Sequence, residues 1–386
     1  MIAGAGSGKT RVLTYKIAYL LASGDYSPYQ ILALTFTNKA AREMKERIAS
    51  VVGGATASRL WMGTFHSIFS RILRTNAERI GFSRDFTIYD QSDSRSLIKT
   101  VIKEMSLDDK VYKPATVQAI ISNAKNALIT PSAYAANAAL IEADMRSKRP
   151  LIRDIYKIYW SRCARAGAMD FDDLLLYTNI LFRDHPDVLE FYQNQFRYVL
   201  VDEYQDTNTA QFELIRLLAG KYKNLCVVGD DDQSIYKFRG ATIENILSFE
   251  KQYHGAKVIR LEQNYRSTKS ILDAANAVIS HNQGRKGKKL WTKNASGDKI
   301  TVYEALNESD EANYVAGRIF SISKGKNFKD FAILYRTNAQ SNALEYAFKR
   351  NSIPYRIIGG TRFFDRAEVK AVSYTHLRAH ETDSYL

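Results

Sequence analysis

The sequence predicts an α/β fold in which helices cover both faces of a parallel sheet. Short apolar segments alternate with helix-length segments over much of the 386-residue chain, and a glycine-rich segment precedes the first amphipathic helix. A mainly helical stretch over residues 85–185 interrupts this alternation. We therefore expect a sheet domain with an inserted helical subdomain, followed by the start of a second α/β domain.

The predicted elements follow one another along the chain. In the first part, they are a helix over residues 10–23, a buried strand at 31–36, a helix over 39–51 and strands at 198–201, 225–228 and 258–261. The insert has helical periodicity over residues 92–105, 115–127 and 150–165, and later strands are predicted at 300–303, 331–335 and 355–358. The predicted domains are 1–84 with 186–257, the insert 85–185, and a partial second sheet domain 258–371.

Both ends of the sequence depart from this pattern. Only Met1 and Ile2 precede the glycine-rich segment, whereas a buried parallel strand normally has about 4–8 apolar residues, so we expect the native start to lie upstream. From residue 372 the amino-acid sequence resembles a translated sequencing adapter. We interpret residues 372–386 as a non-native tail and exclude His376 and His380 from every site.

The composition is that of a globular protein with excess positive charge. Lys and Arg number 55 against 41 Asp and Glu, which gives a net charge of +14 and favours a polyanionic partner such as nucleic acid. No apolar run is long enough to cross a bilayer, so no membrane partner is expected. Two cysteines, Cys163 and Cys226, are too few for a disulfide framework and favour the cytoplasm.

Residues 3–10 fit a phosphate-binding loop, with Ala3 in place of the usual first glycine. The loop could surround an anion with backbone N–H groups from Gly4, Ala5, Gly6, Ser7 and Gly8. Lys9 could reach the β- and γ-phosphates, and the Thr10 hydroxyl could ligate Mg²⁺. The sequence therefore predicts a site for a nucleoside triphosphate with Mg²⁺.

Polar residues follow two of the predicted strands. Asp202 and Glu203 come after the strand at 198–201, on the ligand edge of a parallel sheet. Asp202 could hold Mg²⁺, and Glu203 could orient and deprotonate the attacking water. Gln233 follows the next strand and could sense the γ-phosphate. We interpret the acidic residues 230–232 as helix caps and turn formers.

Several segments together carry a family resemblance. They are Ala3–Arg11, Thr35–Ala41, Gly63–Ser67, Val201–Asp206, Gly229–Ala241 and Gln263–Thr268. In this order they closely resemble the UvrD/PcrA/Rep group of superfamily 1 DNA helicases, over about residues 1–371. The resemblance implies RecA-like sheet domains, ATP and Mg²⁺ as ligands, and 3′→5′ movement on single-stranded DNA and at junctions with duplex, in repair or replication restart.

The resemblance also implies roles for individual residues. Arg11 and Tyr265 would flank the adenine, and Arg266 would contact the γ-phosphate across the cleft between two RecA-like domains. The DNA channel would be lined by Phe36, Asn38, Phe65, His66, Tyr236, Phe238 and Arg239. Phe238 stands where the family usually has Trp, and core packing remains an alternative for Phe36 and Phe65. Protein partners are not predicted.

Two charged segments have more than one interpretation. The basic run of Arg285, Lys286, Lys288 and Lys289 could contact phosphates, but a solvated face is favoured. The carboxylates between Asp170 and Asp173 look like a catalytic pair, and we favour a structural or coupling role.

We expect the parent protein to be an ATP-dependent helicase and these 386 residues alone not to separate strands. One alternative is the motor portion of a helicase–nuclease, and another is a non-motor, ATP-dependent DNA-binding module. Glu203 counts against the second alternative, because a pure switch need not keep a water-activating carboxylate.

Overall fold

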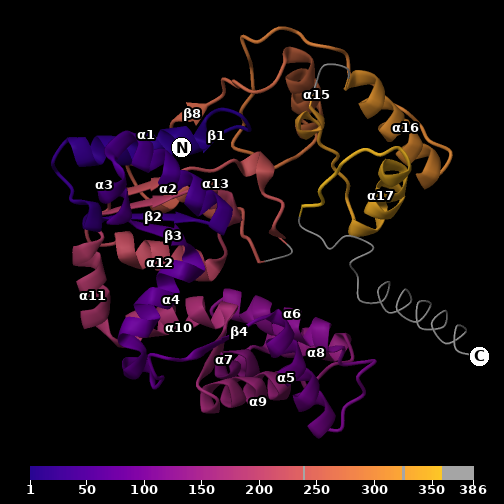
Figure 1. The fold of residues 1–386 in the computed structure, drawn as a ribbon. Helices are drawn as coiled ribbons and strands as arrows, with labels where there is room; N and C mark the ends of the chain where they lie inside the picture. The colour runs from indigo at the N-terminus through magenta and orange to yellow at the C-terminus, as the bar shows by residue number, and fades with distance from the viewer. Residues whose placement is uncertain (238–239, 324–326, 359–386) are drawn as a thin grey trace, which may run out of the picture. The chain divides into compact units, whose positions relative to one another are not determined.

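The computed structural model describes residues 1–237, 240–323 and 327–358, and the chain divides into two compact units, residues 1–298 and 299–386 (Figure 1). Phe238, Arg239 and the predicted non-native tail lie outside the described residues. The predicted boundaries between domains stay predictions. Within the described residues, no helix combines the length and the apolar character that crossing a bilayer requires.

The first unit is built on a parallel sheet with the strand order β3–β2–β6–β7. The strands are β3 (Trp61–Thr64), β2 (Ile31–Thr35), β6 (Tyr198–Val201) and β7 (Leu225–Val227). A short parallel pair, β1 (Ile2–Ala3) and β8 (Arg260–Leu261), adjoins β7, because the Ala3 N–H donates to the Gly229 carbonyl at 2.9 Å. The parallel sheet and the strands predicted at 31–36, 198–201 and 225–228 are confirmed to within one residue, whereas the strand predicted at 258–261 is present only at Arg260–Leu261.

Helices make up most of the remaining first unit. Those that pack on the sheet or connect to it are α1 (Lys9–Ala22), α2 (Asn38–Val52), α3 (Gly54–Ser58), α4 (Phe65–Asn76), α10 (Phe171–Asp184), α11 (Pro186–Gln195), α12 (Thr209–Ala219), α13 (Glu244–Leu247) and α14 (Phe249–Gln252), and α15 (Lys269–Ile279) follows β8. Those of the insert are α5 (Gln91–Glu104), α6 (Pro114–Asn126), α7 (Pro131–Ala136), α8 (Ala138–Arg146) and α9 (Ile152–Arg165).

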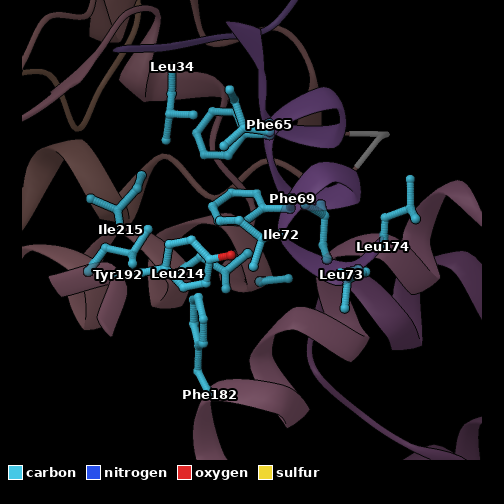
Figure 2. Packing of buried hydrophobic residues seen from close by; sticks show 14 of the residues in the cluster. Leu34, Phe65, Phe69, Ile72, Leu73, Leu174, Phe182, Tyr192, Leu214 and Ile215 are labelled. Carbon is cyan, nitrogen blue, oxygen red and sulfur yellow. The ribbon is translucent and has the colours of Figure 1, made fainter. Parts of the chain in front are cut away.

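Successive residues of the central strands are buried on opposite faces of the sheet. In β2, Ile31 and Ala33 pack in a cluster with α1 and α2, whereas Leu32 and Leu34 join a larger cluster with α4, α10 and α12. Figure 2 shows the larger cluster, in which Leu34 lies beside Phe65 of α4. Burial on both faces explains why these strands are apolar without alternation.

The insert has a hydrophobic core of its own, formed by α5, α6, α7 and α9. It begins and ends with β4 (Thr87–Tyr89) and β5 (Ala168–Asp170), which pair in parallel. The sequence predicted the helices but not this pair, because three-residue strands carry no recognisable period. The helix after β5, α10, packs in the cluster under the sheet, so it joins the insert to the sheet domain.

The second unit contains α16 (Glu308–Ile322) and α17 (Ser341–Arg350), which pack through Ala312, Ala316 and Phe348. The prediction of strands at 300–303, 331–335 and 355–358 was wrong. None of these segments forms a strand in the described part of the unit. A strand needs hydrogen-bonding neighbours, and these segments have no ladder partner among the described residues.

Candidate nucleotide and DNA site

The phosphate loop runs from the end of β1 to the first turn of α1. Gly6 and Gly8 have φ angles of 68° and 90°, a left-handed conformation that disfavours residues with a Cβ. Ser7 closes the loop, because its hydroxyl donates to the Gly4 carbonyl at 2.7 Å. Gly8 is the N-cap of α1 and has no side chain to accept from the first-turn N–H groups, so these donors stay available to an anion. Thr10 lies in that first turn.

The structure brings the loop lysine to the carboxylates after β6. The Lys9 Nζ lies 3.0 Å from Glu203 Oε2, although the two residues are 194 positions apart. Asp202 is buried and accepts the Glu203 N–H at 3.0 Å. Burial, followed by the nearby Glu203 charge, raises the pKa of Asp202 to about 6. The predicted meeting of Lys9, Asp202 and Glu203 at one sheet edge is therefore present.

Gln205 is a buried side chain that the sequence analysis did not single out. Its amide nitrogen donates to Glu203 Oε2 at 2.9 Å, and its amide oxygen accepts the Asp230 N–H at 2.9 Å. It therefore connects the loop after β6 to the loop after β7. Its place in the segment Val201–Asp206, three residues after Asp202, was the sequence signal for it.

The segment after β8 contacts the phosphate loop directly. The Tyr265 N–H donates to the Gly6 carbonyl at 3.0 Å, and the Asn264 amide donates to the Ala5 carbonyl at 2.7 Å. Asn264 also accepts the Arg266 N–H at 2.8 Å, so it fixes the turn that presents Arg266. The side chains of Tyr265 and Arg266 are exposed beside the loop. Asn264 was not among the residues predicted for the site, and its contacts make it a positioning residue for this turn.

Arg11 has a different neighbour from the one expected in the nucleotide-bound state. Its guanidinium lies 5.5 Å from the centre of the Tyr15 ring, one helical turn further along α1. Its role beside adenine stays a prediction.

The basic run is not the solvated face that the sequence favoured. The Lys288 side chain is only 1% exposed, and its Nζ lies within 2.8 Å of carboxylate oxygens of Asp230, Asp231 and Asp232. Arg285 binds Asp232 through two hydrogen bonds of 2.6 Å. A lysine without a partner is usually exposed. Lys288 is buried here because three carboxylates from a loop that is distant in sequence pair with its ammonium group.

The acidic residues 230–232 are turn formers, as predicted. Asp230 caps the turn by accepting the Asp232 N–H at 3.2 Å, and it also accepts a hydrogen bond from the exposed Gln233 side chain. Gln233 therefore lies on the same turn that Gln205 ties to Glu203.

Three of the predicted DNA contacts line one cavity of about 610 Å³ between the sheet edge and the insert. They are Phe36, His66 and Tyr236. Burial lowers the pKa of His66, so the ring is neutral at pH 7, and it lies edge-on to Phe171 at 5.8 Å. A neutral imidazole and the aromatic rings suit bases better than phosphates.

The other predicted DNA residues differ in exposure. Asn38 is exposed at the start of α2. Phe65 is 1% exposed and packs against Phe36 with ring centres 5.3 Å apart, so its ring takes the core role that the sequence left open. A base could not stack on Phe65 in this structure.

The carboxylates between Asp170 and Asp173 form a structural ion-pair network. The fully buried Lys125 side chain lies 2.7 Å from Asp170 and 2.8 Å from Asp173. Asp170 also accepts from the Tyr159 hydroxyl at 2.7 Å and caps α10 by accepting the Asp173 N–H at 2.9 Å. These contacts support the structural interpretation.

Comparisons with known proteins agree with this geometry. Residues 1–254 match the UvrD/REP helicase N-terminal domain, and residues 259–385 match the UvrD-like helicase C-terminal domain. The chain is 54% identical over 385 residues to the ATP-dependent DNA helicase PcrA of Staphylococcus epidermidis (strain RP62A) and to the protein of the same name from Staphylococcus aureus (strain Mu50). These alignments cover 99% of this chain and 52% of each relative, so the chain spans about half the length of the curated relatives it matches.

Proposed function

The chain belongs to the UvrD/REP helicase family, and on this premise we propose that it hydrolyses ATP to move 3′→5′ along single-stranded DNA. The observation that carries the proposal is the contact between Lys9 and Glu203 beside an open phosphate loop. The curated relatives are named ATP-dependent DNA helicases, which supports the same activity. DNA repair or replication restart and a cytoplasmic location are parts of this proposal.

The residues at the loop fit a triphosphate with Mg²⁺. Asp202 is a buried carboxylate with a raised pKa, because burial makes its ionised form unfavourable. A nearby cation would offset this cost. Thr10 and Asp202 would hold the ion, and Mg²⁺ would neutralise charge that develops on the phosphate oxygens. The backbone N–H groups of the loop would hold the β-phosphate.

Glu203 and Lys9 exchange partners in the proposed reaction. In the structure they neutralise each other, and a bound triphosphate would draw the Lys9 ammonium to its phosphate oxygens. The freed Glu203 carboxylate, still held by Gln205, would take a proton from water as the water oxygen bonds to the γ-phosphorus. The bond between the γ-phosphorus and the bridging oxygen breaks, and ADP leaves.

The remaining residues would act around this centre. Arg266 would stabilise the charge of the transition state, Gln233 would sense the γ-phosphate, and Arg11 with Tyr265 would flank the adenine. Single-stranded DNA would lie along Phe36, Asn38, His66, Tyr236, Phe238 and Arg239. Tyr236 is three residues from Gln233, so one loop would report on both DNA and nucleotide.

The test is phosphate release by the purified chain with and without oligo(dT). We expect hydrolysis that rises when single-stranded DNA is added and that stays low with duplex alone. Polarity is measured with a fluorophore at either end of the oligonucleotide, and movement toward the 5′ end is expected. Nucleotide binding without hydrolysis in either condition would favour the non-motor module instead.

A further inference from the structure

Two segments of the first unit that are distant in sequence are held together by a buried charge cluster. We call residues 230–232 the acidic turn and residues 285–291 the basic strap. Lys288 of the strap places its Nζ 2.7 Å from Asp230, 2.5 Å from Asp231 and 2.8 Å from Asp232. Arg285 adds two bonds to Asp232, and the Lys286 N–H donates to Asp231 at 2.8 Å.

The far end of the strap reaches the phosphate loop. Leu290 packs so closely on Gly4 that a Cβ at this glycine would lie 2.1 Å from a Leu290 methyl carbon. The Trp291 carbonyl accepts the Asn264 N–H at 2.7 Å. Since Asn264 also binds the loop carbonyl of Ala5 and the N–H of Arg266, the strap is continuous with the turn that presents Arg266.

The acidic turn is equally connected on its other side. The Asp230 N–H donates to Gln205, which in turn donates to Glu203, and Gln233 donates to the Asp230 carboxylate. The charge cluster therefore connects Glu203 and Gln233 on one side to the turn of Arg266 on the other.

We propose that Arg285 and Lys288 are positioning residues for ATP hydrolysis. They hold the acidic turn, which leads to Gln233, against the basic strap, which positions Arg266. This inference rests on the proposed function. Neither side chain needs to touch the nucleotide. Lys288 supplies the cation that faces two buried carboxylates and the partly buried Asp232, so a side chain of the strap balances the negative charge of the acidic turn.

A buried charge cluster is an unusual way to hold two segments together if packing is its only purpose. Burying a lysine with several carboxylates has a large desolvation cost, and apolar residues of similar volume hold segments together at least as well. What the cluster offers is directional: five hydrogen bonds or ion pairs fix distance and orientation at once. Such control matters at a site where a shift of about 1 Å can lower the rate by about 100-fold.

The test compares Arg285→Gln and Lys288→Gln with Lys289→Gln. Lys289 is the exposed neighbour in the same run, so its substitution removes the same charge from the same segment. We expect kcat for DNA-stimulated ATP hydrolysis to fall about 10- to 100-fold in the first two variants while KM stays within about twofold, and no change in the third. Lys288→Arg should restore part of the rate. A parallel loss of nucleotide affinity and rate, or an unchanged rate in folded Arg285→Gln, would overturn the proposal.

A second measurement does not depend on catalysis. Hydrogen–deuterium exchange of residues 263–268 should become faster in Arg285→Gln than in the unsubstituted chain, although these residues lie about twenty positions away from the substitution. Lys289→Gln should leave that exchange unchanged. Unchanged exchange in Arg285→Gln contradicts the inference even if Lys288→Gln does not fold. A chain that hydrolyses no ATP would refute the proposed function, and the exchange experiment would still decide whether the strap positions the Arg266 turn.

Discussion

Glu203 has a backbone conformation that is rare for its residue type. Its φ angle is 48°, in the left-handed region that few residues other than glycine adopt. The conformation turns the chain sharply after β6, so that Asp202 stays buried while Glu203 reaches Lys9. Strain of this kind persists where neighbouring contacts hold it, and here Gln205 and Lys9 supply them.

This arrangement predicts different effects for the two partners of the ion pair. Glu203→Gln keeps the shape of the side chain but removes the proton acceptor, so hydrolysis should fall by about 10²–10⁴-fold with nucleotide affinity retained. Lys9→Ala should lower both affinity and hydrolysis. Phosphate release and titration with a fluorescent ATP analogue measure the two quantities. Glu46→Gln, an exposed substitution on α2, is the control, and equal loss of affinity in both site variants would contradict the assignment.

A second residue-scale prediction concerns the cavity beside the insert. Tyr236 is partly exposed and lines the cavity with Phe36 and His66. Stacking on one base contributes ~1–3 kcal/mol, so Tyr236→Ala should weaken binding of oligo(dT) about 5- to 150-fold, whereas Tyr236→Phe should keep most of the affinity. Fluorescence anisotropy measures this. Tyr19→Ala changes an exposed tyrosine on α1 and should have no effect. Equal weakening by the Phe variant would assign the effect to the hydroxyl instead.

At the scale of elements, local pattern and distant pairing explain which predictions succeeded. The strands β2 and β6 and the helices α1 and α2 were predictable, because apolar runs and helical spacing are local signals. The segment 331–335 has a similar apolar pattern, yet it forms no strand in the described structure, since strand formation depends on partners that the pattern does not specify.

In the site too, residues with a local sequence signal were predictable, and residues whose role depends on distant partners were not. Lys9, Asp202 and Glu203 could be predicted from motifs that each carry their own chemical signal. Gln205 and Lys288 could not, because their roles arise from contacts 25 and 57 positions away, and an isolated lysine in a basic run resembles any surface lysine. Resemblance to a family supplied the expectation for Tyr265 and Arg266, and the structure supplied the contact that places their turn on the loop.

The junction between the insert and the sheet domain predicts a dependence on pH. Burial, followed by the Asp170 charge, raises the pKa of Asp173 to about 7, while Lys125 opposes this shift. The unfolded chain loses this proton near pH 4, so between pH 4 and 7 the folded state binds the proton more tightly. The contribution of Asp173 to stability therefore falls as the pH rises through this window.

Replacing Asp173 removes that dependence. We expect the free energy of unfolding of Asp173→Asn, relative to the unsubstituted chain, to increase from pH 5 to pH 7 and to level off by pH 8. Urea unfolding followed by circular dichroism at each pH measures the difference. Asp170 and Asp172 are retained in the variant, and Asp85→Asn on the exposed surface is the control. A difference that does not vary with pH would show that Asp173 is ionised throughout.

At the scale of the whole molecule, the candidate nucleotide site is contained in one compact unit. Lys9, Asp202, Gln233 and Arg266 all lie in the unit that ends at Asp298. This unit has separate hydrophobic clusters on the two faces of its sheet and a third within the insert. The second unit has its own small cluster around α16 and α17. Nucleotide binding should therefore depend on the first unit.

This division predicts the behaviour of residues 1–298 expressed alone. The piece keeps the phosphate loop, the ion pair of Lys9 with Glu203 and the basic strap, so it should bind a fluorescent ATP analogue within about threefold of the whole chain, since the contacts described above for the loop all lie within residues 1–298. Lys9→Ala in the same piece is the control and should weaken binding as it does in the whole chain. Hydrolysis should be weaker than binding alone would suggest, because family resemblance assigns Arg266 to the cleft between two RecA-like domains. A folded piece that binds no analogue, while the whole chain does, would place essential binding contacts after residue 298.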